Sequence, residues 1–361
     1  MIVFASFYLL PNTLVTQLGI LVMTVLLAWL TYRYIEQPTK RFAHVVPWRV
    51  IVMGFMLPAL SIVSSAKVVE HYAGFPEHFS TEVYQGLQAL NSFSSQIRKA
   101  CHGTNTPTIL PNPDDGILGV EKEEIDFLLI GDSHGNSYTG MLDIWAKDAN
   151  LRGYDIMQTG TLYLPNVHKY HLKRGHMVEF PIFKQRNDTL NEHVKVTKYS
   201  TIILSGYFNA YLKNTTNLKM NNSQSESSKQ NFILVFKEAI YHLIQQSPKV
   251  IILLDVPELK STTAEYSTHA LVLEKYNQCN EDYKRVTRDA FEFLNILQDI
   301  KYEFPQIIII DPTKVFCTED KCTTILNGVL LYRNKDNNHL NYKGSQAIGR
   351  AYLEKFSNPL Q

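Results

Sequence analysis

The fold is decided by one stretch, Glu124-Ile-Asp-Phe-Leu-Leu-Ile-Gly-Asp-Ser-His134. Residues 125–130 form a short apolar run, which is typical of a strand buried in a parallel sheet. The run ends at Gly131, which permits a sharp turn, and an amphipathic segment over 138–151 then predicts a helix. A serine at such a strand-to-helix turn lies at the carboxyl edge of the sheet, beside the amides of a helix start. Ser133 is therefore a candidate nucleophile with an oxyanion site beside it.

The same strand-then-helix pattern repeats through the rest of the chain. Further strands are expected over 154–158, 201–205, 250–255 and 307–311. Further helices are expected over 231–246, 280–300 and 343–356. Alternation of this kind predicts an α/β fold, in which a parallel sheet is covered by helices on both faces. The polar stretch 213–230 predicts a mobile loop.

A second chemical signal lies near the carboxyl end, where Asp336 and His339 are three residues apart. At this spacing the carboxylate can accept a hydrogen bond from the imidazole Nδ1–H, which leaves Nε2 facing a hydroxyl group. Serine is a poor nucleophile until such a base takes its proton. Each signal alone is common, since Gly-Asp-Ser recurs by chance and Asp-x-x-His often marks a solvated turn. Their joint position, after the first strand and before the last helix, is much more specific and favours one site at the sheet edge.

The amino-terminal region predicts membrane helices. No charged residue precedes Arg33, and the apolar residues 13–31 are long enough to cross a bilayer. A second apolar run, 50–66, is interrupted by Pro58, which membrane helices tolerate when the freed carbonyl finds a partner. Both runs are interpreted as transmembrane helices, and the alternative is a pair of buried core helices.

The loop between the two runs predicts the orientation in the membrane. Its charges are Arg33, Lys40, Arg41 and Arg49 against Glu36. By the positive-inside rule this loop is cytoplasmic, so everything after Lys67 is expected on the external side. No basic stretch precedes the first run, so a cleaved signal peptide is not expected. Residues 1–10 are also apolar and look like the tail of an earlier span, which suggests that the chain begins partway through a longer multi-pass protein.

Composition disfavours two classes of ligand. The formal net charge of +1 gives no strongly basic surface to neutralise phosphates, so nucleic acid is not an expected partner. A metal is not expected either. Four histidines lie in a polar region without cysteine or carboxylate in register, which favours a solvated loop; they are His168, His171, His176 and His193.

The four cysteines fit an external compartment, where disulfides persist. Cys317 and Cys322 are close in sequence and are interpreted as a disulfide. The alternative, half of a zinc site, has no second ligand pair with suitable spacing nearby. A Cys101–Cys279 bridge is a further possibility, because sequence does not determine connectivity.

Gly131-Asp-Ser133 together with Asp336-x-x-His339 resembles the SGNH hydrolase superfamily. More closely, the chain is similar to the external SGNH domain fused to multi-pass membrane O-acyltransferases of bacteria. Shared features are the Gly-Asp-Ser-His134 form, the Tyr-x-x-x-Asp-x-x-His-Leu ending, the paired cysteines before that ending and the preceding apolar helix. The segment Tyr32-Arg-Tyr-Ile-Glu-Gln-Pro38 resembles the end of the membrane acyltransferase domain. The resemblance implies that most of the membrane helices would precede Met1.

The resemblance implies an architecture and a location. The fold would be an SGNH (flavodoxin-like) parallel sheet flanked by helices and preceded by two N-terminal transmembrane helices. Residues 1–69 would be the membrane segment, 70–120 a linker or extension, and 121–361 the catalytic domain. The protein would lie in the bacterial inner membrane, with the catalytic domain on the periplasmic side.

The resemblance also implies an activity. The family transfers an acyl group, usually acetyl, to a cell-surface glycan such as a polysaccharide or lipopolysaccharide. The acyl donor would derive from acetyl-CoA through a membrane acyltransferase domain, in this chain or in a separate partner, and no cofactor would be bound in the SGNH domain. A glycan O-acetyl esterase would use the same residues with water as acceptor. A third reading, a glycan-binding ectodomain with a decayed triad, is opposed by the intact Ser133, Asp336 and His339.

By position, the resemblance implies that Ser133 is the nucleophile, His339 the base and Asp336 the residue that orients the base. Asp132 is expected to hold the turn through hydrogen bonds from its side chain to the backbone, rather than to take part in catalysis. His134 would either contact the substrate or begin the helix.

The oxyanion hole of the family uses the serine amide, a glycine amide and an asparagine side chain. Gly160, after the second strand, is the matching glycine, and Asn209, after the third, is the matching asparagine. The sequence around Asn209 departs from the usual Gly-x-Asn-Asp, so Gly206 or a neighbouring amide is the alternative donor.

Overall fold

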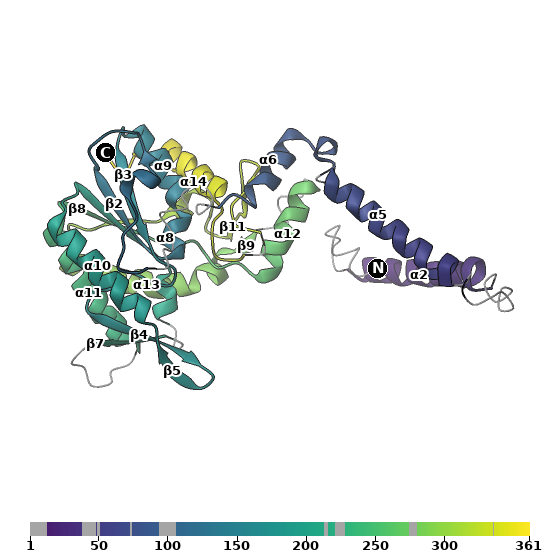
Figure 1. The fold of residues 1–361 in the computed structure, drawn as a ribbon, viewed down its shortest axis with the longest axis horizontal. Coiled ribbons are helices and arrows are strands. Elements are labelled where there is room, and N and C mark those ends of the chain that lie inside the picture. The colour runs from purple at the N-terminus through teal and green to yellow at the C-terminus, as the bar shows by residue number, and fades with distance from the viewer. Residues whose placement is uncertain are drawn as a thin grey trace. The chain divides into compact units, whose positions relative to one another are not determined.

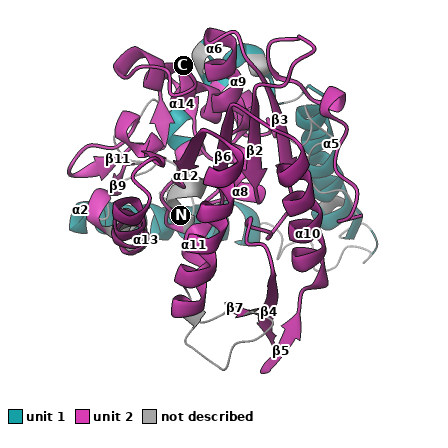
Figure 2. Ribbon diagram, turned by 90° about the vertical axis from the view of Figure 1, so that its left-hand side faces the viewer, with its two compact units in different colours: residues 1–85, 269–278 teal, residues 86–268, 279–361 magenta. Residues whose placement is uncertain are grey.

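The structure is a computed structural model that describes residues 13–37, 48, 51–72, 74–93, 106–212, 216–220, 228–273, 280–334 and 336–361. It contains two compact units, coloured separately in Figure 2. The first comprises Met1–Gln85 and His269–Gln278, and the second comprises Gly86–Thr268 and Cys279–Gln361. Cys101 and Cys279, and with them the proposed bridge, lie outside the described residues, as do Lys40, Arg41 and Arg49 of the loop predicted to be cytoplasmic.

The first unit contains a long apolar helix where the sequence predicts one. It comprises α2 (Leu14–Thr31) and the π-helical η1 (Tyr32–Glu36), and the hydroxyl of Thr13 accepts a hydrogen bond from the amide of Thr16 at its start. Among the described residues, this helix alone is long and apolar enough to cross a membrane, and none of its apolar window is buried. The first expected span is therefore present as a candidate.

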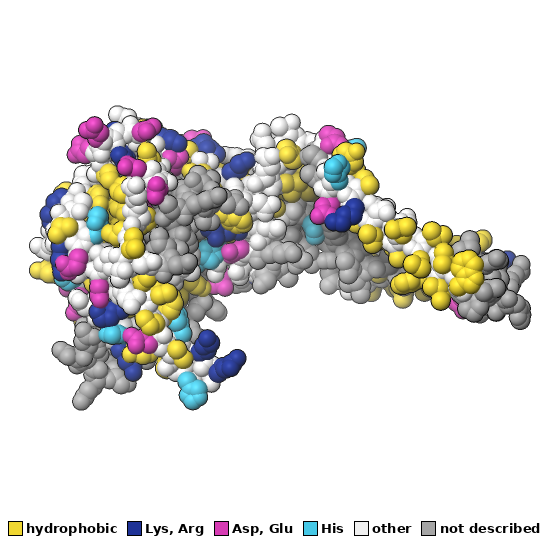
Figure 3. Space-filling view, in the orientation of Figure 1, with side chains coloured by type: hydrophobic (Ala, Val, Ile, Leu, Met, Phe, Trp, Pro, Cys, Tyr) yellow, Lys and Arg dark blue, Asp and Glu magenta, His cyan; other side chains and the backbone are white. Residues whose placement is uncertain are grey.

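The second expected span forms a helix, but it does not meet the length and composition of a membrane helix within the described residues. A π turn, η2 (Val52–Met56), precedes α5 (Leu57–His71), and Pro58 lies in the first turn of α5, where a missing N–H is tolerated. The last turns of α5 are polar and include a Lys67–Glu70 pair, although its earlier turns expose apolar side chains (Figure 3). One of the two predicted transmembrane helices is thus a candidate span among the described residues, and the second, whose apolar run begins at a residue outside them, stays a prediction.

The second unit is built on a six-stranded sheet with the order β1-β3-β2-β6-β8-β10 (Figure 1). Its strands are β1 (Leu118–Gly119), β2 (Phe127–Gly131), β3 (Arg152–Met157), β6 (Thr201–Ser205), β8 (Lys249–Leu253) and β10 (Ile308–Ile310). The last five are parallel to one another, and β1 runs antiparallel along β3. Their spatial order is that of a flavodoxin-like sheet, which confirms the predicted fold class.

Helices cover both faces of this sheet and bury two separate cores (Figure 1). One face carries α9 (Thr139–Asp148) and α14 (Tyr342–Lys355). The other carries α10 (Pro181–Val196), α11 (Ser228–Gln246) and α13 (Tyr283–Glu303). Successive residues of β2 enter opposite cores, as the two-residue period of a strand requires, because Leu128 packs toward α10 and α11 and Leu129 toward α9.

The sequence did not predict a smaller antiparallel sheet in the second unit. It contains β4 (Val167–Lys173), β5 (His176–Glu179) and β7 (Thr216–Met220) in the order β5-β4-β7. The histidines predicted to lie in a solvated loop are instead on β4, β5 and α10, and β7 lies inside the stretch predicted to be mobile. These strands were missed because β5 and the end of β4 are exposed on both faces, so no apolar alternation marks them.

The remaining elements are short. They are η3 (Pro76–His78), α6 (Thr81–Ala89), η4 (Pro113–Asp115), α8 (Ser133–Ser137), η5 (Phe208–Tyr211), α12 (Ser261–Val272) and η7 (Pro312–Val315). Two further antiparallel pairs of short strands are β9 (Glu281–Asp282) with β11 (Lys321–Cys322), and β12 (Ile325–Leu326) with β13 (Val329–Leu330).

Residues 106–120, just before the expected catalytic domain, belong to the larger unit. The guanidinium of Arg186 donates to the carbonyl of Ile109 at 3.0 Å, and the hydroxyl of Tyr154 donates to the carbonyl of Pro111 at 2.5 Å. Because β1 also pairs with β3, residues 106–120 are packed onto the sheet, and the wider linker or extension over 70–120 stays a prediction.

Asn341 fixes the chain where it enters the last helix. Its side-chain oxygen accepts from the amide of Gly344 at 2.6 Å and caps α14. Its amide group donates to the carbonyls of Leu330 and Tyr332, at 2.6 and 2.9 Å. The side chain is fully buried, so all these groups depend on it for their hydrogen bonds.

We expect Asn341→Ala to lower the free energy of unfolding by about 2–4 kcal/mol, from the lost cap and the two carbonyls left without a donor. Thermal or denaturant unfolding of the detergent-solubilised chain measures the change. Asn338→Ala, three residues earlier and partly exposed, is the matched control and should cost less than about 0.5 kcal/mol. Equal losses in the two variants would contradict this role for Asn341.

Candidate active site

The turn that carries Ser133 is shaped by Asp132. The Asp132 carboxylate accepts a hydrogen bond from the amide of His134 at 2.9 Å and so caps α8. The same carboxylate accepts from the amide of Tyr207, which ties the turn to the segment after β6. With this cap the helix begins at Ser133 itself, earlier than the predicted start at residue 138. The Ser133 side chain is half-buried at this position and remains accessible.

Two glycines allow the turn to lie directly against β6. A Cβ atom on Gly131 would lie 1.9 Å from the carbonyl oxygen of Ser205, and one on Gly135 would lie 2.8 Å from the same oxygen. Any larger residue would push α8 away from the sheet, so these glycines set the depth at which Ser133 lies.

The three residues predicted as a triad are brought together. His339 Nε2 lies 3.0 Å from Ser133 Oγ, and His339 Nδ1 lies 3.0 and 3.2 Å from the two carboxylate oxygens of Asp336. These are hydrogen-bond distances, and they follow the order hydroxyl, imidazole, carboxylate that activates a serine. The loop is anchored by Asn337, whose side-chain amide donates to the carbonyl of Leu259 at 3.0 Å.

Hydrogen bonds keep Asp336 ionised. Burial alone would raise its pKa, but hydrogen bonds from the His339 ring and the Asn338 amide outweigh burial and lower the pKa to about 2. The backbone amide of His339 also donates to this carboxylate, at 3.0 Å. An ionised carboxylate in this position favours the imidazole tautomer with the proton on Nδ1, which leaves Nε2 to accept the serine proton.

A second histidine–aspartate pair lies beside the first. His134 Nδ1 lies 2.7 Å from Asp255 Oδ2, and the His134 ring stacks on Tyr207 at 4.3 Å and lies 4.1 Å from the ring of His339. Burial alone would lower the pKa of His134, but the Asp255 carboxylate outweighs burial and raises it. Burial raises the pKa of Asp255, and the charge of His134 opposes that change.

Sequence reasoning missed Asp255 and left the role of His134 undecided. The available signal was position, because Asp255 follows the end of β8 and so lies at the same sheet edge as Ser133. His134 is 3% exposed, so its ring acts as a packing surface for His339 and Tyr207 within this site.

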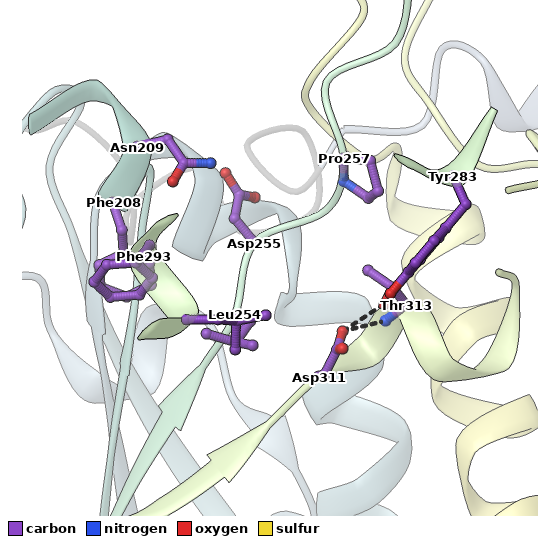
Figure 4. Close-up of a pocket in the computed structure, with 10 residues that line it drawn as sticks. Phe208, Asn209, Leu254, Asp255, Pro257, Tyr283, Phe293, Asp311 and Thr313 are labelled. Atoms are coloured by element: carbon purple, nitrogen blue, oxygen red, sulfur yellow. Dashed lines mark hydrogen bonds between the residues drawn. The ribbon is translucent and has the colours of Figure 1, made fainter. Parts of the chain in front are cut away.

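A pocket opens beside this pair (Figure 4). Its walls are Phe208, Asn209, Leu254, Asp255, Pro257, Tyr283, Phe293, Leu294, Asp311 and Thr313. The side chains of Asn209 and Asp255 point toward one another across it (Figure 4). Asn209 Oδ1 is buried without a hydrogen-bond partner among the described residues, and no described hydrogen bond joins Asn209 to Ser133. Its role in the oxyanion hole therefore stays a prediction.

The turn at Gly160 lies next to the nucleophile turn. Gly160 has a φ of +66°, which favours glycine, and the amide of Thr161 closes the turn on the carbonyl of Gln158 at 3.0 Å. A Cβ atom on Gly206 would meet Leu162 at 2.8 Å and the carboxyl group of Asp132 at 3.2 Å. The Gly160 turn, through Leu162, and the Ser133 turn, through Asp132, thus both pack against Gly206. The space there is too small for a side chain on residue 206.

Cys317 and Cys322 form a disulfide, as predicted. Within the described parts of the chain, no group of three or more histidine, cysteine, aspartate or glutamate side chains is arranged to hold a metal ion.

The fold and the site together define an α/β protein of the SGNH type, with a flavodoxin-like sheet and Ser133, His339 and Asp336 at its carboxyl edge. Residues 100–354 match the family described as the SGNH domain (fused to AT3 domains). The chain belongs to this family.

Solved structures give more distant similarities. The periplasmic domain of a lipopolysaccharide acetyltransferase from Salmonella ser. Paratyphi A is 15% identical, with a TM-score of 0.48, and the match covers 76% of this chain and 97% of that one. A carbohydrate esterase family 2 enzyme from Corynascus thermopiles (Myceliophthora fergusii) is 9% identical, with a TM-score of 0.33, over 65% of this chain and 66% of that one. The acetyl xylan esterase Est2A of Butyrivibrio proteoclasticus is 11% identical, with a TM-score of 0.32, and the match covers 65% of this chain and 64% of that one. No curated protein sequence matches the chain.

The lowered pKa of Asp336 predicts how stability depends on pH. A carboxyl group whose pKa falls on folding stabilises the fold above its unfolded value, near 3.9, and this contribution is lost as the pH falls toward 2. We expect Asp336→Asn to unfold more easily than wild type by about 1–2 kcal/mol above pH 5, and by progressively less between pH 4 and pH 2. Denaturant titrations across this range measure the difference.

The matched control for this experiment is Asp188→Asn, whose carboxylate pairs with Lys184 on the surface of α10. An exposed pair of this kind contributes less than about 1 kcal/mol. A difference for Asp336→Asn that is constant from pH 6 to pH 2 would contradict the assigned ionisation.

Proposed function

We propose that the chain is an O-acyltransferase that places an acyl group, most simply acetyl, on a hydroxyl of a cell-surface glycan. The single observation that supports this best is the 3.0 Å distance between Ser133 Oγ and His339 Nε2, with Asp336 on the other side of the ring. Membership of a family of SGNH domains fused to AT3 domains agrees with acyl chemistry at this site.

The proposed reaction has two steps through an acyl-enzyme. Ser133 Oγ attacks the carbonyl carbon of the donor while His339 Nε2 takes the hydroxyl proton, and the proton then passes to the leaving group. The acyl group is left as an ester on Ser133. A sugar hydroxyl then gives its proton to His339 and attacks that ester, which transfers the acyl group and returns the proton to Ser133.

Negative charge develops on the acyl oxygen in both steps. The amides of Ser133 and Gly160 are the proposed donors to this oxygen, with the Asn209 side chain as a third donor once it turns from the pocket. Preorganised donors of this kind are worth about a hundred- to a thousand-fold each in rate.

The choice between transfer and hydrolysis depends on the acceptor. The same three residues would serve an esterase, with water in place of the sugar hydroxyl, and this is the second candidate function. The apolar helix Leu14–Glu36 favours transfer, because a membrane anchor keeps the site beside a membrane acyl donor. In this proposal the acyl group derives from acetyl-CoA through a membrane acyltransferase, and the larger unit lies on the periplasmic side of the bacterial inner membrane.

We expect Ser133→Ala to abolish the acyl groups that the wild-type chain adds to glycan in cells, because alanine cannot form the ester intermediate. The O-acetyl content of purified surface glycan, measured by NMR in a strain that lacks the chromosomal copy, reports the result. Loss of acetyl on mutation supports transfer, a gain supports the esterase, and an unchanged content overturns both.

Ser357→Ala is the control for this experiment, because Ser357 is exposed after the end of α14. This variant should leave the acetyl content at the wild-type level. The amounts of both variants in the membrane fraction must match wild type, so that a change in acetyl content is a change in chemistry.

A further inference from the structure

A buried lysine holds the turn at Gly160. Lys169, on β4, is only 4% exposed. Its ammonium group donates to the carbonyl of Gly160 at 2.7 Å and to the hydroxyl of Tyr211 at 3.1 Å. Aromatic rings surround it, with the ring centre of Tyr211 at 4.6 Å and that of Phe183 at 5.4 Å. The amine is therefore fixed in one place by hydrogen bonds and cation–π contacts.

The turn itself is held at three points. The amide of Thr161 donates to the carbonyl of Gln158, the carbonyl of Gly160 accepts from Lys169, and the amide of Leu162 donates to the Tyr211 hydroxyl at 3.2 Å. Among the described residues, the Gly160 amide donates to no protein acceptor. These three hydrogen bonds thus orient the turn and leave the N–H group of Gly160 available for a ligand.

This turn is close enough to Ser133 to matter for its chemistry. The amide of Gln158 donates to the carbonyl of Gly131, the residue that ends β2. Leu162 and Asp132 both pack against Gly206. A displacement of the Gly160 turn would therefore also displace the turn that carries Ser133.

A charged lysine here is unfavourable for stability. Burial lowers the pKa of Lys169 to about 8, and the nearby charge of Asp132 only partly opposes this. Within the described residues the amine forms no recorded ion pair, and its hydrogen bonds go to the neutral carbonyl of Gly160 and hydroxyl of Tyr211. A methionine of similar length would fill the same space without the desolvation of an ammonium group. Stability alone does not explain a lysine at this position.

We propose that Lys169, as the ammonium ion, is a positioning residue that holds the Gly160 turn so that its amide faces the oxyanion formed at Ser133. This inference rests on the proposed function. Lys169 does not touch the reacting atoms in this scheme. The groups that face it are Asp132 at the start of α8, the Tyr211 hydroxyl on η5, and His171 on its own strand, whose pKa is lowered by its burial and by the charge of Lys169.

The test is Lys169→Met in the full-length, detergent-solubilised chain, with p-nitrophenyl acetate as the acyl donor. We expect kcat to fall about ten- to a hundred-fold with KM unchanged, since a misplaced donor weakens the transition state and not substrate binding. The melting temperature should stay within a few degrees of wild type or rise, because a desolvated charge has been removed. Lys173→Met, exposed on the same face of β4, is the matched control and should keep the wild-type kcat.

A pH profile gives a second, independent readout. In wild type, kcat should fall as the pH rises through about 8, where Lys169 loses its proton, and this fall should be absent in Lys169→Met. A Lys169→Met enzyme with the wild-type kcat overturns the proposal. If that variant does not fold, a wild-type kcat that stays level from pH 7 to pH 9.5 also overturns it.

Ser133→Ala in the same assay separates this inference from the proposed function. Full turnover by Ser133→Ala would overturn the proposed function and the role of Lys169 together. Loss of turnover in Ser133→Ala, with wild-type turnover in Lys169→Met, would overturn the role of Lys169 alone.

Discussion

The site depends on the close approach between the turn after β2 and the carbonyl oxygen of Ser205 at the end of β6. Gly131 and Gly135 leave no space there for a side chain, so the short helix α8 lies on the sheet edge and not above it. The other contacts of the site follow from this depth. Asp132 comes within reach of the Tyr207 amide, and His134 can extend past β6 to Asp255, which follows the end of β8. A bulkier turn would separate all of these groups at once.

Two histidine–aspartate pairs therefore lie side by side, but their surroundings differ. The outer pair, His339 with Asp336, is part-exposed and its carboxylate is stabilised by backbone amides. The inner pair, His134 with Asp255, is buried, and its imidazole is packed between two rings. A base must exchange protons with a substrate, which requires access, whereas a packing surface requires immobility. The difference in burial thus agrees with the proposed roles, in which His339 is the base and His134 supports its ring.

The sequence predicted most reliably what is carried by local pattern. The apolar run over 201–205 is found as β6 with the same bounds, and the spacing of Asp336 and His339 correctly implied their hydrogen bond. Prediction from sequence failed for the contacts that form only when distant segments of the chain pack together. Asp255 is a single carboxylate after a strand, and only the fold shows that it meets His134. Lys169 occurs in a polar stretch that reads as solvated, yet aromatic residues from α10 and η5 enclose it. The residues next to Lys169 in the sequence do not show that these aromatic side chains surround it.

Ser133 and His339 are 206 residues apart in the chain. His339 lies just before α14, which is held on α9 by hydrogen bonds from Met141 to Ser345 and from Trp145 to Gly349, close to the carboxyl end of the domain. A nascent or partly folded chain therefore presents the serine turn without its proton acceptor. For the proposed reaction, the site is therefore complete only after the carboxyl-terminal helix has packed, and activity would require the whole larger unit.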